Sequence, residues 1–405
     1  MILPFAVLLG TIALAPLLFG GWWLRHYPKV AIGLGAITLG YYLFGLHAGT
    51  RVLHVAHEYV SFIALIGSLY VVSGGIHIKV KGEATPFVNV IFLLVGALLA
   101  NVLGTTGASM LLIRPWIRMN KYRITAHHIV FFIFIVSNIG GCLTPIGDPP
   151  LFLGYLKGVP FWWVAEHCWP MWAVGLGLLL GIFYFVDRFN FKLAPEDIRE
   201  KETAQETWRF DGLPNLFFLA IILGAVFISK PVFVREALMI LAAVGSYYTT
   251  RKTVHEANHF NFHPIQEVAI LFIGIFATMI PALDWLELNA AKLGEPTPGF
   301  YYWGSGLLSS ALDNAPTYLS FLSALIGATH DSDMAHLLAT NGISVVAISV
   351  GSVFFGACTY IGNGPNFMVK SIADQQKVHA PTFLGYIFRF ALPVMLPVLV
   401  IVWLV

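Results

Sequence analysis

Two aspartates stand inside stretches that are otherwise apolar, and both are surrounded by residues that interrupt a helix. Asp148 lies in the sequence TPIGDPP, and Asp313 begins the sequence DNAPT. A carboxylate removed from water is costly, so its presence there indicates a functional site. Apolar surroundings favour its protonated form and a neighbouring cation favours its ionised form, so one group could hold a proton and a cation in turn. Asp313 is the stronger candidate because hydroxyl and amide side chains flank it.

These polar residues also have simpler explanations. Asp313 could cap the helix that follows it, and Asp148 could be a cap or turn residue before two prolines. The amide of Asn138 serves helix packing as well as it serves an ion. His127 and His128 are expected to be solvated histidines at the membrane surface.

Four polar segments interrupt the apolar stretches, and they come in pairs. Segments 105–109 and 313–317 are the centres of stretches 86–113 and 299–327, and we expect two hairpins there. Segments 144–150 and 359–366 are expected to break two longer helices. A broken helix frees carbonyl oxygens for a cation and exposes a helix N-terminus. The candidate ion ligands are Thr105, Thr106, Gly107, Asn138, Thr144, Asp148, Asp313, Asn314, Thr317, Thr359, Asn363 and Asn366, with Asp313 and Asp148 as proton carriers.

The elements that carry these segments form two similar halves. GCLTPIGDPPLFL, which begins at Gly141, matches GACTYIGNGPNFM, which begins at Gly356. NVLGTTGASMLL likewise matches SSALDNAPTYLS, and the two matches occur in the same order. The sequence therefore predicts a first membrane repeat (1–186), a charged cytoplasmic linker (187–212) and a second membrane repeat (213–405).

The lysines and arginines predict the orientation of the halves. If both hairpins begin and end on the same side of the membrane, most basic residues fall on one side, which is then cytoplasmic. Each half would cross the membrane an odd number of times, so the second repeat would be inverted. The predicted fold is all-α and polytopic, with two inverted repeats of five spans, each with one re-entrant hairpin and one broken helix. Both termini would be periplasmic.

Composition excludes several classes of protein. Only 11% of the 405 residues are charged and 58% are hydrophobic, which is typical of a protein embedded in a lipid bilayer. The formal net charge of +2 disfavours a nucleic-acid partner. The chain has no Walker A sequence, which disfavours ATP hydrolysis. The sequence also shows no cluster of a nucleophile, a general base and a metal ligand at the same depth in the membrane, so we do not expect the protein to be an enzyme or to bind a cofactor.

At these residues the chain resembles the ion transporter superfamily. SNIGGCLTPIGDPPLFLGYLKGVPFWW (137–163) and LDNAPTYLSF (312–321) look most like NhaD-type sodium:proton antiporters. Arsenite permeases of the ArsB type and sodium/dicarboxylate carriers are related. The first hairpin here lacks the acid that arsenite permeases have, and neither tip has the Ser-Asn-Thr of the carboxylate carriers. The resemblance also implies a homodimer in a bacterial inner membrane.

These observations predict a secondary active transporter that exchanges sodium or lithium for protons by alternating access. Sodium would be a substrate or coupling ion at the predicted site, and the partners would be small inorganic cations, protons and the lipid bilayer. The alternative is transport of arsenite, another small anion or a carboxylate. An integral membrane enzyme and a channel are weaker alternatives.

Overall fold

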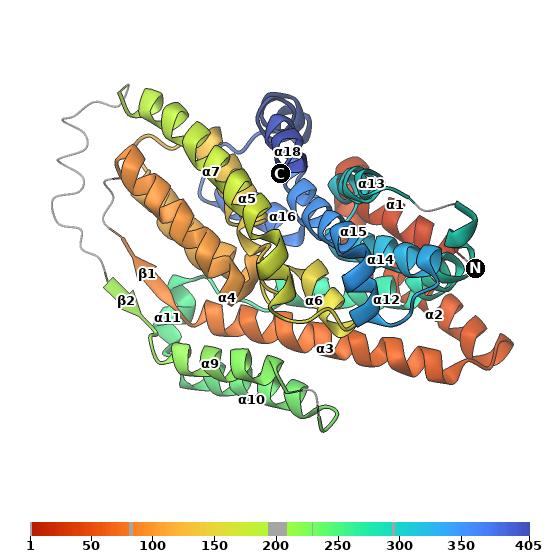
Figure 1. The fold of residues 1–405 in the computed structure, drawn as a ribbon. Coiled ribbons are helices and arrows are strands. Elements are labelled where there is room, and N and C mark those ends of the chain that lie inside the picture. The colour runs from red at the N-terminus through yellow and green to blue at the C-terminus, as the bar shows by residue number, and fades with distance from the viewer. Residues whose placement is uncertain (1, 81–83, 193–208, 229, 294–295) are drawn as a thin grey trace.

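The computed structural model describes residues 2–80, 84–192, 209–228, 230–293 and 296–405, which form a bundle of helices (Figure 1). The first half contains α1 (Leu3–Leu18), α2 (Gly20–Gly40), a π-helical continuation (Tyr41–Gly45), α3 (Gly49–Gly74), β1 (His77–Lys79), α4 (Pro86–Met119), α5 (Ala126–Ile135), a 3₁₀ turn (Ile139–Gly141), α6 (Pro149–Leu156) and α7 (Trp163–Lys192).

The second half begins with the strand β2 (Arg209–Asp211), which pairs antiparallel with β1. It continues with α9 (Asn215–Val226), α10 (Val234–Thr249), α11 (Lys252–Ala257), α12 (His263–Asn289), a 3₁₀ turn (Ala290–Leu293), α13 (Pro298–Ala311), α14 (Asn314–Thr329), α15 (Met334–Phe355), a 3₁₀ turn (Gly356–Cys358), α16 (Gly364–Gln375), α17 (Phe383–Tyr386), a π-helix (Ile387–Met395) and α18 (Leu396–Trp403).

The helices have the length and composition that a bilayer requires. By length and composition, six helical segments of the described chain could cross a membrane: Gly49–Gly74, Pro86–Met119, Trp163–Lys192, His263–Asn289, Met334–Cys358 and Phe383–Trp403. Pro86–Met119 is not one continuous helix, because it is interrupted at Gly104. A helix satisfies its own backbone hydrogen bonds, which is why apolar segments of this length are helical in lipid. The predicted all-α, multi-pass membrane protein is thus confirmed, with β1 and β2 as a short ribbon outside the helices.

Helix α4 folds back on itself and is named hairpin 1 here. Gly104 has a φ of 73° and a ψ of 155°, a conformation that interrupts the helix and that glycine adopts readily. Asn89 near the start of α4 and Asn120 just beyond its end exchange hydrogen bonds of 2.8 and 3.1 Å. The two ends of α4 therefore lie together. The turn falls one residue before the predicted tip (105–109), whose residues begin the second arm.

Helices α13 and α14 form a second hairpin, named hairpin 2. Helix α13 ends at Ala311 and α14 begins at Asn314. The rings of Phe300 and Phe321 lie 6.0 Å apart, which brings the start of α13 beside the middle of α14. Where each hairpin lies in a membrane, and whether the two halves are inverted repeats, remain predictions.

Both predicted helix breaks occur in the structure. Break 1 (136–148) separates α5 from α6, and break 2 (356–363) separates α15 from α16. Each contains a single 3₁₀ turn, and each is followed by a helix with proline in its first turn. Proline lacks an N–H and fits the first turn of a helix, where no hydrogen bond is lost. The prolines therefore fix where α6 and α16 begin.

Long helices flank the hairpins and breaks. Figure 1 shows α3 running along one side of the bundle, with α9 and α10 packed against its outer side. Helix α12 contacts α2, α3 and α14. Break 1 contacts hairpin 1 and α7, and α6, which follows it, contacts α3 and α14.

The predicted linker (187–212) differs from the structure at its first residues. Residues up to Lys192 continue α7, and Asp187 is fully buried rather than exposed to solvent. Residues 209–211 form β2. The central part of the predicted linker, 193–208, lies outside the described residues.

Candidate functional site

Asp148 accepts hydrogen bonds from both hairpins and from break 2. Its carboxylate lies at the end of break 1, just before α6, and is only 1% exposed. Oδ1 accepts from Thr105 Oγ1 at 2.7 Å and from Asn363 Nδ2 at 2.9 Å. Oδ2 accepts from Asn314 Nδ2 at 2.5 Å. The four predicted polar segments therefore meet at one carboxylate.

Three asparagines extend this centre and connect break 1 with break 2. Asn363 Nδ2 also donates to the carbonyl oxygen of Ser137 at 3.0 Å and to Asn138 Oδ1 at 3.3 Å. Asn138 Nδ2 donates to Asn366 Oδ1 at 2.7 Å. Asn366 Nδ2 donates to carbonyl oxygens within break 2. Asn138 thus holds the two breaks side by side.

A small cavity lies beside the Asp148 carboxylate. Its volume is about 20 Å³, and it is lined by the turn of hairpin 1, the end of break 1 and the α3 residues Leu65, Ile66 and Leu69. A cavity needs about 10–15 Å³ to hold one water molecule. The space therefore suits a single water-sized species, such as a water molecule or a small cation.

The charge of Asp148 is stabilised by neutral groups alone. In the part of the chain that the structure describes, no lysine, arginine or histidine forms an ion pair with it. Neutral donors offset part of the cost of burying an ionised carboxylate, and a proton or a cation would offset more. Asn314 Oδ1 is buried without a hydrogen-bond partner among the described residues and offers one more oxygen.

Asp313 has a different environment. It is half-buried and caps α14, because its Oδ1 accepts a hydrogen bond from the backbone N–H of Ala315 at 3.1 Å. The capping role considered for it in the sequence is therefore present. Asn314, the next residue, donates to Asp148, so Asp313 is adjacent in the chain to a residue of that centre.

The remaining predicted ligands fall into two groups. Thr106 and Gly107 line the small cavity with Thr105. The hydroxyls of Thr144, Thr317 and Thr359 donate to backbone carbonyl oxygens of Asn101, Asp313 and Ser310. These three threonines hold the local backbone, whereas Thr105 binds the carboxylate itself.

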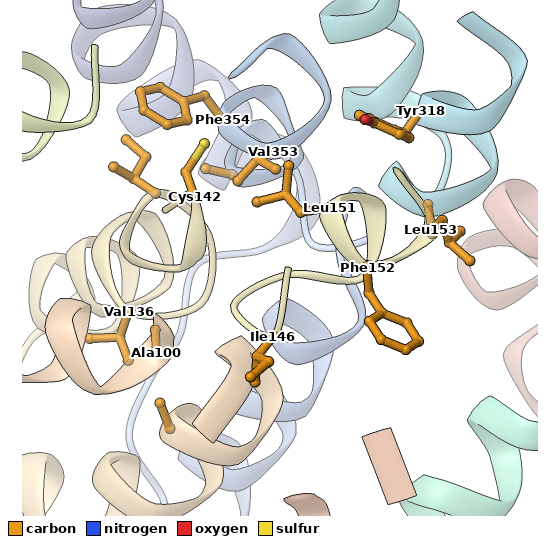
Figure 2. Close-up of a cluster of buried hydrophobic side chains, with 14 of the residues drawn as sticks. Ala100, Val136, Cys142, Ile146, Leu151, Phe152, Leu153, Tyr318, Val353 and Phe354 are labelled. Atoms are coloured by element: carbon orange, nitrogen blue, oxygen red, sulfur yellow. The ribbon is translucent and has the colours of Figure 1, made fainter. Parts of the chain in front are cut away.

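Apolar side chains surround the site. Figure 2 shows buried side chains from hairpin 1, break 1, α6, α14 and α15 around break 1 and α6, including Ala100, Val136, Cys142, Ile146, Leu151, Phe152, Leu153, Tyr318, Val353 and Phe354. Such packing excludes water, and electrostatic interactions are stronger where water is excluded. The polar groups around Asp148 therefore act in a medium of low polarity.

A second polar cluster closes the base of hairpin 1, and the sequence did not indicate it. Asp187 from α7 pairs with both Nη atoms of Arg123. His128 Nε2 lies 3.0 Å and His127 Nε2 3.4 Å from Asp187 Oδ1. His128 is fully buried and His127 is 9% exposed, so the expectation of solvated histidines is wrong. The partners are far apart in the sequence, so local patterns could not reveal the cluster.

Asn101 was also not among the ligands predicted from the sequence, and it binds break 1 directly. Its side chain donates to the carbonyl oxygen of Gly140 at 2.6 Å and accepts from the N–H of Leu143 at 2.9 Å. Its position as an amide inside an apolar stretch is the sequence signal that could have identified it.

Comparison with known proteins agrees with this architecture. A family model with the description "Putative citrate transport" matches residues 1–405. No curated protein matches the chain. Since the match spans the whole chain, with its membrane-spanning helices, the protein is a secondary transporter and a multi-pass membrane protein. The chain belongs to this citrate transport family, which is a transporter family of the ion transporter type.

Proposed function

We propose that this transporter exchanges sodium or lithium ions for protons at the Asp148 carboxylate by alternating access. One observation carries the proposal. Asp148 is buried, has no basic partner in the described structure, and is bonded to both hairpins and to break 2. A buried carboxylate of this kind is neutralised either by a proton or by a cation. The two species therefore compete for one group, which is the chemistry of exchange.

The ligands for a cation would be oxygens. Thr105 Oγ1 and Asn314 Oδ1 are neutral oxygens beside the Asp148 carboxylate, and they suit a hard monovalent ion. Asp313 adds a second negative charge near the same centre, and Thr106 borders the small cavity. Asn138, Asn363 and Asn366 hold the breaks in place around the ion.

The finer architecture is part of the proposal. Two inverted repeats, each with a re-entrant hairpin, would let the chain present the Asp148 site to either side of the membrane in turn. The similarity of break 1 and break 2 and the asymmetric distribution of basic residues support this arrangement. The protein would lie in a bacterial inner membrane as a homodimer, with both termini in the periplasm.

Carboxylate transport is the second candidate, and the family match favours it. A tricarboxylate carries several negative charges and does not fit the cavity of about 20 Å³ beside Asp148. It would require a more open conformation and a cation between its carboxylates and Asp148. In that case the Asp148 site would bind the coupling ion while citrate bound beside it.

One experiment distinguishes cation:proton exchange from carboxylate transport. The purified protein is reconstituted in proteoliposomes that contain a pH-sensitive dye, and sodium, lithium, citrate, succinate and arsenite are added in parallel. Cation exchange predicts a pH change with sodium or lithium in the absence of any carboxylate. Uptake of labelled citrate that requires sodium would support the second candidate. A response to arsenite or a carboxylate with no response to either cation would refute the proposed function.

A further inference from the structure

We propose that Asn101 is a positioning residue that fixes break 1 against hairpin 1 and thereby sets the cation affinity of Asp148. Asn101 lies in the last turn before Gly104 and is 8% exposed. Its side-chain amide donates to the carbonyl oxygens of Ala97 and Gly140 at 3.1 and 2.6 Å. The inference rests on the proposed function of the Asp148 site, on which Asn101 acts through the backbone of break 1.

Asn101 holds break 1 at three points. Its side chain binds Gly140 on one side of Cys142 and Leu143 on the other. Its backbone carbonyl accepts from Thr144 Oγ1 at 2.6 Å. That carbonyl belongs to the last turn of the first arm of hairpin 1, where carbonyl oxygens lack helical partners. The free carbonyl oxygen at the end of the first arm thus accepts a hydrogen bond from break 1.

The contacts continue from Thr144 to the carboxylate. Thr144 Oγ1 accepts a hydrogen bond from the N–H of Gly147 at 3.1 Å. The carbonyl of Gly147 accepts from the N–H of Thr105 at 2.7 Å, and Thr105 Oγ1 donates to Asp148.

These bonds form a closed path from Asn101 through break 1 and back to the tip of hairpin 1. A shift of break 1 at Thr144 would therefore move Gly147 and Asp148 relative to Thr105. Groups that orient a ligand residue in this way typically change metal affinity by about 10–100-fold when they are removed.

Part of this arrangement recurs in the second half of the chain. Thr359 Oγ1 donates to the carbonyl of Ser310 at 2.7 Å and accepts from the N–H of Gly362 at 3.1 Å. The side-chain amide has no counterpart there, because the residue that matches Asn101 in the aligned sequences is Ser309. Ser309 Oγ donates to the carbonyl of Ser352 at 2.6 Å. Break 1, which carries the buried carboxylate, is thus bound by an asparagine of its hairpin, whereas the asparagine that binds break 2 at two points, Asn366, lies in α16.

The test compares Asn101→Ala with a matched control, Asn215→Ala. Asn215 is also buried and donates to Gly75 O and Thr250 Oγ1 at 2.8 Å, but it lies at the start of α9, away from Asp148. Each variant and the wild-type chain are studied in two ways. Hydrogen–deuterium exchange reports the mobility of peptides that cover break 1. Transport in proteoliposomes gives the half-saturating concentration of sodium and the maximal rate separately.

We expect Asn101→Ala to speed hydrogen–deuterium exchange in break 1 and to raise the half-saturating sodium concentration for transport about 10–100-fold. Asn215→Ala should change neither, although both variants lose thermal stability. Asn101→Ser, which keeps one donor and the backbone carbonyl, should recover part of the affinity.

If hydrogen–deuterium exchange in break 1 is the same in Asn101→Ala and in the wild-type chain, Asn101 does not position break 1. If hydrogen–deuterium exchange in break 1 is faster but the sodium affinity is that of the wild type, Asn101 positions break 1 without affecting the ion site. A wild-type chain that transports no cation would refute the proposed function instead, and the exchange measurement would still decide whether Asn101 positions break 1.

Discussion

Replacing Asp148 by asparagine tests the proposed site most directly, because the change keeps the size of the side chain and removes its charge. The carboxylate accepts two hydrogen bonds at Oδ1 and one at Oδ2. An asparagine has one acceptor oxygen, so at best it keeps the bonds from Thr105 and Asn363 and faces Asn314 with a donor. One lost partner for a buried polar group costs about 1–3 kcal/mol.

The effect on stability should nevertheless be modest. Removing a buried charge that has no basic partner among the described residues relieves a desolvation cost, which offsets the lost hydrogen bond. We therefore expect Asp148→Asn to fold and to unfold at a temperature within several degrees of the wild-type value. Thermal unfolding in detergent checks this before any transport is measured.

The effect on cation binding should be large. A unit charge at about 4 Å contributes about 4 kcal/mol at an effective dielectric constant of 20. Since about 1.4 kcal/mol corresponds to a factor of ten, sodium affinity should fall about 10³-fold. The same variant cannot carry a proton on this group, so exchange should be lost at every sodium concentration that the assay can reach.

Asp313→Asn provides a comparison at the second carboxylate. Asparagine caps a helix about as well as aspartate, so α14 should keep its cap. Sodium:proton exchange should continue with sodium affinity lowered by about tenfold or less, because Asp148 lines the cavity and Asp313 does not. A folded Asp148→Asn protein whose sodium affinity stays within tenfold of wild type would refute the assignment, and loss of exchange only in Asp313→Asn would transfer the role to Asp313.

Two further variants test the framework of the site. Gly104→Ala places a Cβ 3.2 Å from the carbonyl oxygen of Ile146 at a φ and ψ that almost only glycine adopts, so it should cost about 1–3 kcal/mol and slow sodium:proton exchange; an unchanged unfolding temperature would contradict this. Asp187→Ala leaves the buried Arg123 guanidinium unpaired and should cost about 3–5 kcal/mol, measured by thermal unfolding. Adding Arg123→Leu should restore part of that loss, and a double variant less stable than Asp187→Ala would count against the ion pair.

The sequence predicts the helices well because a bilayer imposes one requirement on every span. Apolar length alone identifies the long helices, and prolines and glycines identify the two breaks. The exact turn of hairpin 1 was missed by one residue. Gly104 and Gly107 both lie in this segment, and composition does not tell which of them adopts the positive φ. That choice depends on the close approach of Gly104 to Ile146, which is a tertiary contact.

The polar partners of Asp148 could not be identified from local sequence. Asp313 has polar neighbours in the chain, and these favoured it over Asp148. Asp148 is followed by two prolines, so its local sequence resembles an ordinary turn. Its three donors come from distant segments, and two of them, Asn314 and Asn363, belong to the other half of the chain. The polar environment of a buried group is therefore visible only after the halves have packed.

The origin of those donors also suggests how affinity and conformation are coupled. Asp148 and Thr105 belong to the first half, whereas Asn314 and Asn363 belong to the second. A motion that separates hairpin 2 or break 2 from break 1 removes one or both amide donors from the carboxylate. The ionised form then loses stabilisation, and the carboxylate holds a proton more strongly. A cation at the same place would also lose Asn314 Oδ1 as a ligand, so relative movement of the two halves would shift the competition between proton and cation at Asp148.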